Sequence, residues 1–383
     1  MGETQSVFNW DFNLHIPRVN GTALSEFWFN FILINIIFFL LYNWRGAKQI
    51  HYSSWWLVVF FCLVAFWDTD YFSFARIFYE EIEEFRDPIY KYISSVCFGS
   101  YIIFRFIIWG GALYLVYRTS VRLKLNRNKF IYIFAVFFLL TFSYARVSLA
   151  MALYYYGLSL LIISDRRSKL SRIMYVGIIF IIAFWAHRSI LLPILLTPLI
   201  YIHLTRRKIL LTLIILPVFF IGIKYILGNI IEGVLLIGES AFTESAVGYA
   251  SSQITMEFNW KWEIITTLRY YSFYLSMLII LWKCYFKKIT IEIPKHIQQL
   301  ITITTAIMII AVAILIIANN NLLGLWVIGY RYLYMTGIPI CLILSYLNQR
   351  KLISNKQLNW ILLLPFLYSE LFILGKIITM QFL

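Results

Sequence analysis

Five arginines lie inside or at the edges of long apolar runs: Arg105, Arg146, Arg188, Arg269 and Arg331. An arginine in or near hydrocarbon costs free energy, so such side chains usually face a polar cavity and have a function there. The planar guanidinium group donates paired hydrogen bonds that match the oxygens of phosphates and carboxylates. The pattern therefore predicts a membrane-embedded site for a large anionic ligand.

Two further residues could act as a general base. His187 ends an apolar run and directly precedes Arg188, and a neighbouring cation keeps an imidazole deprotonated more readily. The alternative for His187 is a buried histidine with one hydrogen-bond partner. Asp70 follows Asp68 at the end of another apolar run, where a carboxylate can accept a proton from a hydroxyl group. The alternative for this pair is a helix cap or a solvated loop.

The arginines also have explanations without chemistry. Arginine often marks a helix end, from which its side chain reaches the lipid headgroups. A structural ion pair is the other alternative, in which Glu370 pairs with Lys224 or Arg105. Lys224 is the better match on position, because it and Glu370 both lie a few residues from the outer ends of their predicted spans. Clustered tyrosines, as in 270–271 and 330–334, fit either an interfacial belt or the stacking of sugar rings.

The composition excludes an ordinary soluble domain. Of the 383 residues, 61% are hydrophobic and 13% are charged, and the mean hydropathy is +0.78. Apolar runs such as 130–140 and 173–186 are continuous, whereas the strands of a membrane barrel alternate apolar and polar residues. We therefore expect an all-α, polytopic integral membrane protein with about 12 transmembrane helices, forming a single domain over residues 1–383.

The expected spans lie near residues 26–44, 54–67, 93–117, 130–145, 147–164, 173–187, 189–204, 209–227, 267–282, 299–318, 332–347 and 358–375. Most of the 33 lysines and arginines fall in alternate loops, which contain only two acidic residues, Asp165 and Glu292. The positive-inside rule predicts that these loops are cytoplasmic and that both termini lie outside the cytoplasm. The opposite loops include two long, acidic segments at about 68–92 and 228–266.

On this topology four of the arginines converge on the outer membrane face, and only Arg105 lies near the middle of a span. The net charge of +15 is confined to short loops between spans, which argues against a nucleic-acid partner. The four cysteines and five histidines show no spacing typical of a metal site. We therefore expect no metal and no cofactor.

Four motifs now resemble a known family in their order and spacing. They are Asp68-Thr-Asp-Tyr-Phe-Ser-Phe74, Arg146-Val-Ser-Leu-Ala150, Ala186-His-Arg-Ser-Ile190 and Gly329-Tyr-Arg-Tyr332. Together they resemble bacterial polysaccharide polymerases of the O-antigen polymerase (Wzy) kind, especially the branch related to EpsG. The resemblance extends over about residues 27–375, although the loop at 228–266 matches no motif of the family.

The resemblance implies a membrane-glycosyltransferase (GT-C-like) architecture and an active site at the periplasmic face of the bacterial inner membrane. It implies a polymerase that transfers a growing glycan from undecaprenyl diphosphate onto an incoming lipid-linked repeat unit, with no metal or nucleotide. The implied partners are this lipid-linked oligosaccharide, membrane lipids and, as a candidate, a regulator of chain length. In this role a base takes the proton of the acceptor hydroxyl, with His187 as the first choice and Asp70 as the second. The departing diphosphate is bound by four arginines: Arg146, Arg188, Arg269 and Arg331.

Three other functions share parts of this pattern. A flippase for lipid-linked oligosaccharide would also carry arginines in its membrane region, but spread over the depth of the bilayer. An O-antigen ligase would use the same chemistry with a different acceptor, and only the motif resemblance favours the polymerase over it. A membrane acyltransferase would use a base histidine that commonly opens to the cytoplasm, whereas the predicted topology puts His187 outside.

Overall fold

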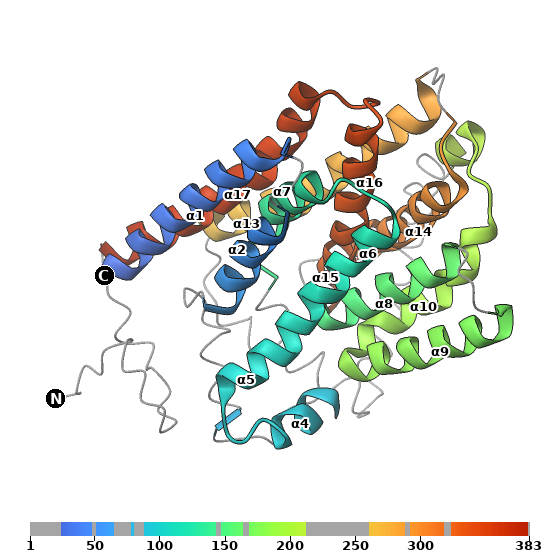
Figure 1. Ribbon diagram of the computed structural model, residues 1–383. Helices are drawn as coiled ribbons and strands as arrows, with labels where there is room; N and C mark the ends of the chain where they lie inside the picture. Colours follow the sequence, from blue (N-terminus) through green and yellow to red (C-terminus); the bar gives the residue numbers. More distant parts are fainter. Residues whose placement is uncertain are drawn as a thin grey trace. The chain divides into compact units, whose positions relative to one another are not determined.

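The computed structural model describes residues 24–47, 51–64, 78–79, 88–142, 147–163, 168–211, 260–287, 292–317 and 323–381. Within these ranges the regular structure consists of helices and contains no strand (Figure 1). The chain divides into two compact units, residues 1–194 with 344–383, and residues 195–343. The all-α expectation is confirmed, and the expectation of one integral membrane domain stays a prediction.

Unit 1 contains α1 (Leu24–Trp44), α2 (His51–Val64), α4 (Pro88–Ser95), α5 (Tyr101–Arg105), the π-helix η3 (Phe106–Gly110), α6 (Gly111–Arg122), α7 (Arg127–Phe138), α8 (Val147–Ile162), α9 (Lys169–Ala186), the 3₁₀-helix η4 (Arg188–Ile190), the beginning of α10 (Leu191–Leu196), the end of α16 (Gly337–Gln349) and α17 (Asn355–Gln381). Helices α1 and α17 lie side by side (Figure 1). Helix α7 contacts α1, α2 and α17, and every residue from Phe130 to Leu140 is buried. This segment is apolar on all sides, which is why it forms the centre of unit 1.

Unit 2 contains the end of α10, the 3₁₀-helix η5 (Thr197–Tyr201), the helical residues 206–211, α13 (Trp260–Leu281), the π-helix η6 (Trp282–Phe286), α14 (Lys295–Ile317), α15 (Leu323–Met335) and the beginning of α16. Helices α14 and α15 pack closely along each other. Gly329 permits this approach, because a Cβ atom there would lie 2.7 Å from the Cγ atom of Leu315. Small residues at helix interfaces allow backbones to come near in membrane proteins.

Three of the described helical stretches are long and apolar enough to cross a membrane: Tyr101–Arg122, Lys295–Ile316 and Asn355–Gly375. Five shorter apolar stretches accompany them: Trp28–Trp44, Tyr52–Leu63, Val147–Ile162, Leu170–Ala186 and Arg188–Tyr201. The three long stretches overlap the predicted spans 93–117, 299–318 and 358–375. The protein is therefore a helical membrane protein, while the total of twelve spans and the GT-C-like architecture stay predictions.

The structure corrects the predicted span 93–117. Phe98 and Gly99 have positive φ values of 51° and 70°, so the chain turns here and the long helix begins only at Tyr101. Ser100 caps that helix, because its side chain accepts a hydrogen bond from the backbone N–H of Ile103. Arg105 therefore lies about 6 Å from the start of the helix, at 1.5 Å per residue, and not near its middle.

The long outer loops are partly helical. Residues 88–92 belong to α4, a short helix that packs on α9, and residues 260–266 belong to α13. Of the remainder, residues 78–79 are helical, while 68–77, 80–87 and 228–259 lie outside the described residues.

Candidate functional site

Two of the predicted arginines lie on neighbouring helices of unit 2. Arg269 belongs to α13 and Arg331 to α15, and these two helices contact each other. The ring of Tyr270 stacks on that of Tyr330, with their centroids 3.9 Å apart. Because Arg269 adjoins one ring in sequence and Arg331 adjoins the other, the two arginines stand at the same level of the helix pair.

A second ring contact sets the direction of the pair. Phe273, three residues after Tyr270, packs edge-on against Tyr334, four residues after Tyr330, with centroids 6.2 Å apart. Contacts that advance along both helices together show that α13 and α15 run in the same direction. Both helices therefore present their N-terminal halves on the same side of unit 2.

Aromatic faces hold the guanidinium group of Arg269. Its Cζ atom lies 4.3 Å from the centroid of the Tyr334 ring and 5.7 Å from that of Tyr270. The residue is only 9% exposed. A cation over an aromatic face is attracted by the ring, more strongly when it is shielded from water. The planar guanidinium group has the geometry for paired hydrogen bonds with the oxygens of a phosphate or carboxylate.

The structure also corrects the depth of these two arginines. The sequence predicts that Arg269 and Arg331 stand at the starts of spans beginning near 267 and 332. Instead, Arg269 lies nine residues after Trp260 and Arg331 lies eight after Leu323, or about 12–14 Å along each helix axis. A site built on this pair is therefore recessed below the ends of its helices.

His187 and Arg188 lie at a bend in unit 1, as expected for a tight turn. His187 ends α9 with an extended backbone and begins η4. Its Nδ1 atom accepts a hydrogen bond from the backbone N–H of Ser189 at 3.2 Å, and the Ser189 hydroxyl lies 2.6 Å from the same atom. His187 is half-buried, whereas Arg188 is exposed.

The contacts of Nδ1 bear on what His187 can do. A backbone N–H can only donate, so Nδ1 must be the acceptor, and a neutral ring then carries its proton on Nε2. In this arrangement Nε2 is a hydrogen-bond donor, and it can act as a base only after the ring exchanges its tautomer. Ser189, two residues after His187, was not predicted from the sequence as its partner.

Arg105 has a structural environment. It is 3% exposed, and its Nε and Nη2 atoms donate to the carbonyl oxygens of Leu63 and Cys62 at 3.1 and 3.0 Å. These carbonyls belong to the last turn of α2, where helix carbonyls lack intrahelical partners and favour a positive charge. The guanidinium Cζ atom also lies 5.0 Å from the centroid of the Trp109 ring. Arg105 thus joins the α5–η3 segment to the end of α2.

The remaining candidates are placed only in part. Arg146 and Asp70 lie outside the described residues, as does Lys224, so their roles stay predictions. The structure pairs Glu370 with Asn35, whose side-chain amide donates to the carboxylate at 3.2 Å. The sequence analysis did not predict the aromatic face beside Arg269, although Tyr330 and Tyr334 stand one helical turn apart on α15 and this i, i+4 spacing could have indicated it.

Comparison with known proteins gives one family. The model of the EpsG family matches residues 51–382, which is most of the chain. This match confirms the resemblance drawn from the four motifs. Neither a curated protein nor a solved structure matches the chain.

Proposed function

The chain belongs to the EpsG family of polysaccharide polymerase-like membrane proteins, and on this premise we propose that it polymerises lipid-linked glycan. In the proposed reaction a growing glycan leaves undecaprenyl diphosphate and joins an incoming lipid-linked repeat unit at the periplasmic face of the inner membrane. The bond between the anomeric carbon and the diphosphate oxygen breaks. A new bond forms to an acceptor hydroxyl, whose proton passes to a base.

The observation that supports this proposal is the Arg–Tyr pair of helices in unit 2. Negative charge develops on the diphosphate oxygens as the glycosidic bond breaks, and fixed cations at those oxygens stabilise the transition state. Arg269 and Arg331 stand at one level on parallel helices, and Arg269 is already oriented by the Tyr334 ring. The stacked tyrosines beside them provide aromatic faces on which sugar rings can pack.

The proposal assigns different parts to the other candidates. Arg146 and Arg188 complete the set of diphosphate-binding residues predicted from the motifs. Asp70 is the first choice for the general base, because Nδ1 of His187 already accepts hydrogen bonds from Ser189. His187 then donates a hydrogen bond through Nε2 to an oxygen of the substrate.

Substitution of the arginines tests the diphosphate site. One bidentate contact from a charged group contributes about 1.5–3 kcal/mol, so its loss should slow polymerisation by about 10- to 100-fold. We expect Arg331→Ala and Arg146→Ala to lose long-chain polymer while membrane expression persists, with Arg350→Gln, an exposed arginine after α16, as the matched control. Normal chain length in both variants would count against the site.

The surface glycan of a deletion strain separates this function from its nearest alternatives. Loss of a polymerase leaves a single repeat unit on the acceptor lipid. Loss of a ligase leaves no glycan there, and loss of a flippase traps the lipid-linked unit on the cytoplasmic side. A single repeat unit, restored to long chains by the wild-type gene, is the result expected here.

A further inference from the structure

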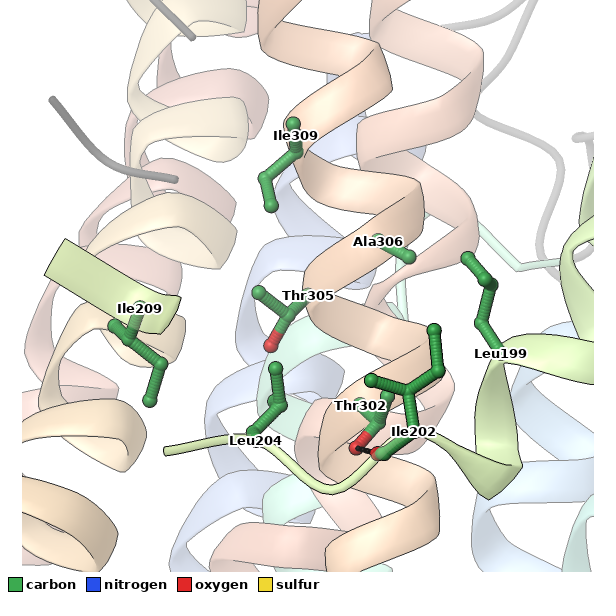
Figure 2. A pocket seen from close by; sticks show the side chains of 8 residues that line it. All are labelled: Leu199, Ile202, Leu204, Ile209, Thr302, Thr305, Ala306 and Ile309. Atoms are coloured by element: carbon green, nitrogen blue, oxygen red, sulfur yellow. Dashed lines mark hydrogen bonds between the residues drawn. The ribbon is translucent and has the colours of Figure 1, made fainter. Parts of the chain in front are cut away.

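Unit 2 contains a partly open, mostly apolar cavity of about 110 Å³ beside α14. Its walls come from α14, from η5 with the segment that follows it, and from the helical residues 206–211 (Figure 2). The lining residues are Leu199, Ile202, Leu204, Ile209, Thr302, Thr305, Ala306 and Ile309. We call this space the α14 cavity.

The two threonines do not make the α14 cavity polar. The hydroxyl of Thr302 donates to the carbonyl of Gln298 at 2.9 Å, and that of Thr305 donates to the carbonyl of Ile301 at 2.7 Å. Both hydroxyls thus donate to backbone carbonyls of α14, and that of Thr302 also lies 3.5 Å from the carbonyl oxygen of Ile202 (Figure 2). Apolar cavities of this kind hold no stable water and accept apolar molecules, and one of about 150 Å³ takes a benzene. The α14 cavity has room for a short stretch of hydrocarbon chain.

The surroundings of the cavity are those of a membrane boundary. Tyr201 is 76% exposed and Trp282 is 61% exposed, and such aromatic residues are enriched where hydrocarbon meets the headgroups. The exposed basic stretch Arg206–Lys208 begins five residues after Tyr201. Arg206 donates a hydrogen bond to the carbonyl of Tyr285 in η6. This bond fixes the basic stretch against the end of the α13–η6 helix.

We propose that the α14 cavity and the basic stretch Arg206–Lys208 together form a binding site for an anionic phospholipid. The hydrocarbon chain enters the cavity, and the phosphate of the headgroup lies at the basic residues. Basic pockets between helices on the cytoplasmic side are the usual sites for anionic headgroups, and the positive-inside rule predicts that Arg206, Arg207 and Lys208 lie on that side. The site is independent of the proposed polymerase function and lies at the opposite membrane face from the one predicted for catalysis.

Native mass spectrometry of the purified full-length protein tests the site. The protein is exchanged into detergent and titrated separately with phosphatidylglycerol and phosphatidylcholine of the same chain lengths. We expect the anionic lipid to be retained preferentially. Arg207→Gln should weaken its binding by about fivefold, which corresponds to the contribution of one basic residue near a membrane surface. Ala306→Leu should abolish the retained lipid by filling the cavity.

Control variants keep the result interpretable. Arg350→Gln removes an exposed arginine of unit 1 and should leave lipid binding unchanged. If Ala306→Leu lowers the yield of folded protein, Ile309→Phe fills the same cavity from the next turn of α14. Equal retention of both lipids, or unchanged binding in the cavity-filling variants, would overturn the proposal. Displacement of the bound lipid by geranylgeranyl phosphate at equal concentration would also overturn it, because a polyprenyl chain would then be the preferred occupant.

Discussion

Two buried arginines, one in each unit, are held in different ways. Arg105 in unit 1 donates two hydrogen bonds to backbone carbonyls at the end of α2, so its charge is used within the protein. Arg269 in unit 2 lies over the ring of Tyr334, with its Cζ atom 4.3 Å from the ring centroid. The hydrogen bonds of Arg105 join two helices, whereas the aromatic contact of Arg269 places a cation beside the stacked tyrosines of α13 and α15.

The largest effect is expected from Arg105. The substitution Arg105→Ala leaves two backbone carbonyls of α2 without their donor, and each hydrogen bond from a charged group contributes about 1.5–3 kcal/mol. We expect little folded protein in the membrane and a large drop in the melting temperature in detergent. Arg188→Ala, which removes an exposed arginine of the same unit, should leave the melting temperature unchanged. A normal melting temperature for Arg105→Ala would show that Arg105 does not stabilise the fold, and the contrast with Arg269 would then fail.

Substitution of Arg269 should act mainly on activity. Arg269→Gln removes a donor fork for the diphosphate, with an expected loss of about 1.5–3 kcal/mol in transition-state stabilisation, or about 10- to 100-fold in polymerisation rate. The melting temperature should fall less than in Arg105→Ala, because glutamine keeps a polar side chain at position 269, whereas alanine at position 105 leaves the α2 carbonyls without their donor. The measurement is the rate of polymer formation per folded molecule with lipid-linked substrate.

The ring under Arg269 offers a sharper test of the same point. Tyr334→Leu removes the aromatic face, and the loss of a shielded cation–π contact is worth about 2 kcal/mol. Tyr334→Phe keeps the face and is the matched control. The comparison predicts a clear loss of rate for the leucine variant and a near-normal rate for the phenylalanine variant. Equal rates in both would mean that the ring does not orient the arginine.

The packing at Gly329 links the helix pair to α14. Gly329→Ala places a Cβ atom 2.7 Å from the Cγ atom of Leu315, so the Leu315 side chain or the α14–α15 packing must shift, at a cost of about 1–3 kcal/mol. The shift moves Tyr330 and Arg331 relative to α13 and should lower the rate as well as the melting temperature. Gly177→Ala in α9 is the control, since a Cβ atom there meets nothing within 4 Å. Similar melting temperatures for the two variants would show that the close packing of α14 and α15 does not require a glycine at position 329.

The sequence predicted where helices exist better than where they begin. The expected spans 26–44 and 173–187 agree with α1 (24–44) and α9 (169–186), because an apolar run bounded by polar residues has only one way to lie in a membrane. The starts of α13 and α15 were wrong for a specific reason. Charged Arg269 and Arg331 were taken as helix ends, yet the tyrosines around them allow arginines to lie well inside a helix.

Two features of the site could not be predicted from the sequence. The turn at Phe98 and Gly99 interrupts the segment 93–117, which the sequence predicts as one helix. A positive φ at a phenylalanine is rare, so the residue type at position 98 does not indicate a turn. Arg105 was therefore placed too deep, and its partners on α2 lie more than 40 residues away in sequence. The pairing of α13 with α15 likewise depends on tertiary contacts between segments 60 residues apart. The periodicity of apolar residues within either helix carries no information about these contacts.

The smallest effect is expected at the His187 turn. Ser189→Ala removes the hydroxyl beside Nδ1 but keeps the backbone N–H that donates to the same atom. The loss of one neutral hydrogen bond costs about 0.5–1.5 kcal/mol, so the rate of polymerisation should fall by about 2- to 10-fold. His187→Ala removes the Nε2–H donor and should reduce the rate further, whereas His187→Gln retains a donor and should recover part of it. If His187 is instead the base, glutamine gives no recovery, and the pH profile of the rate loses its acidic limb in both His187 variants but not in Ser189→Ala. That outcome would return the base role from Asp70 to His187 and would mean that the ring exchanges its tautomer during the reaction.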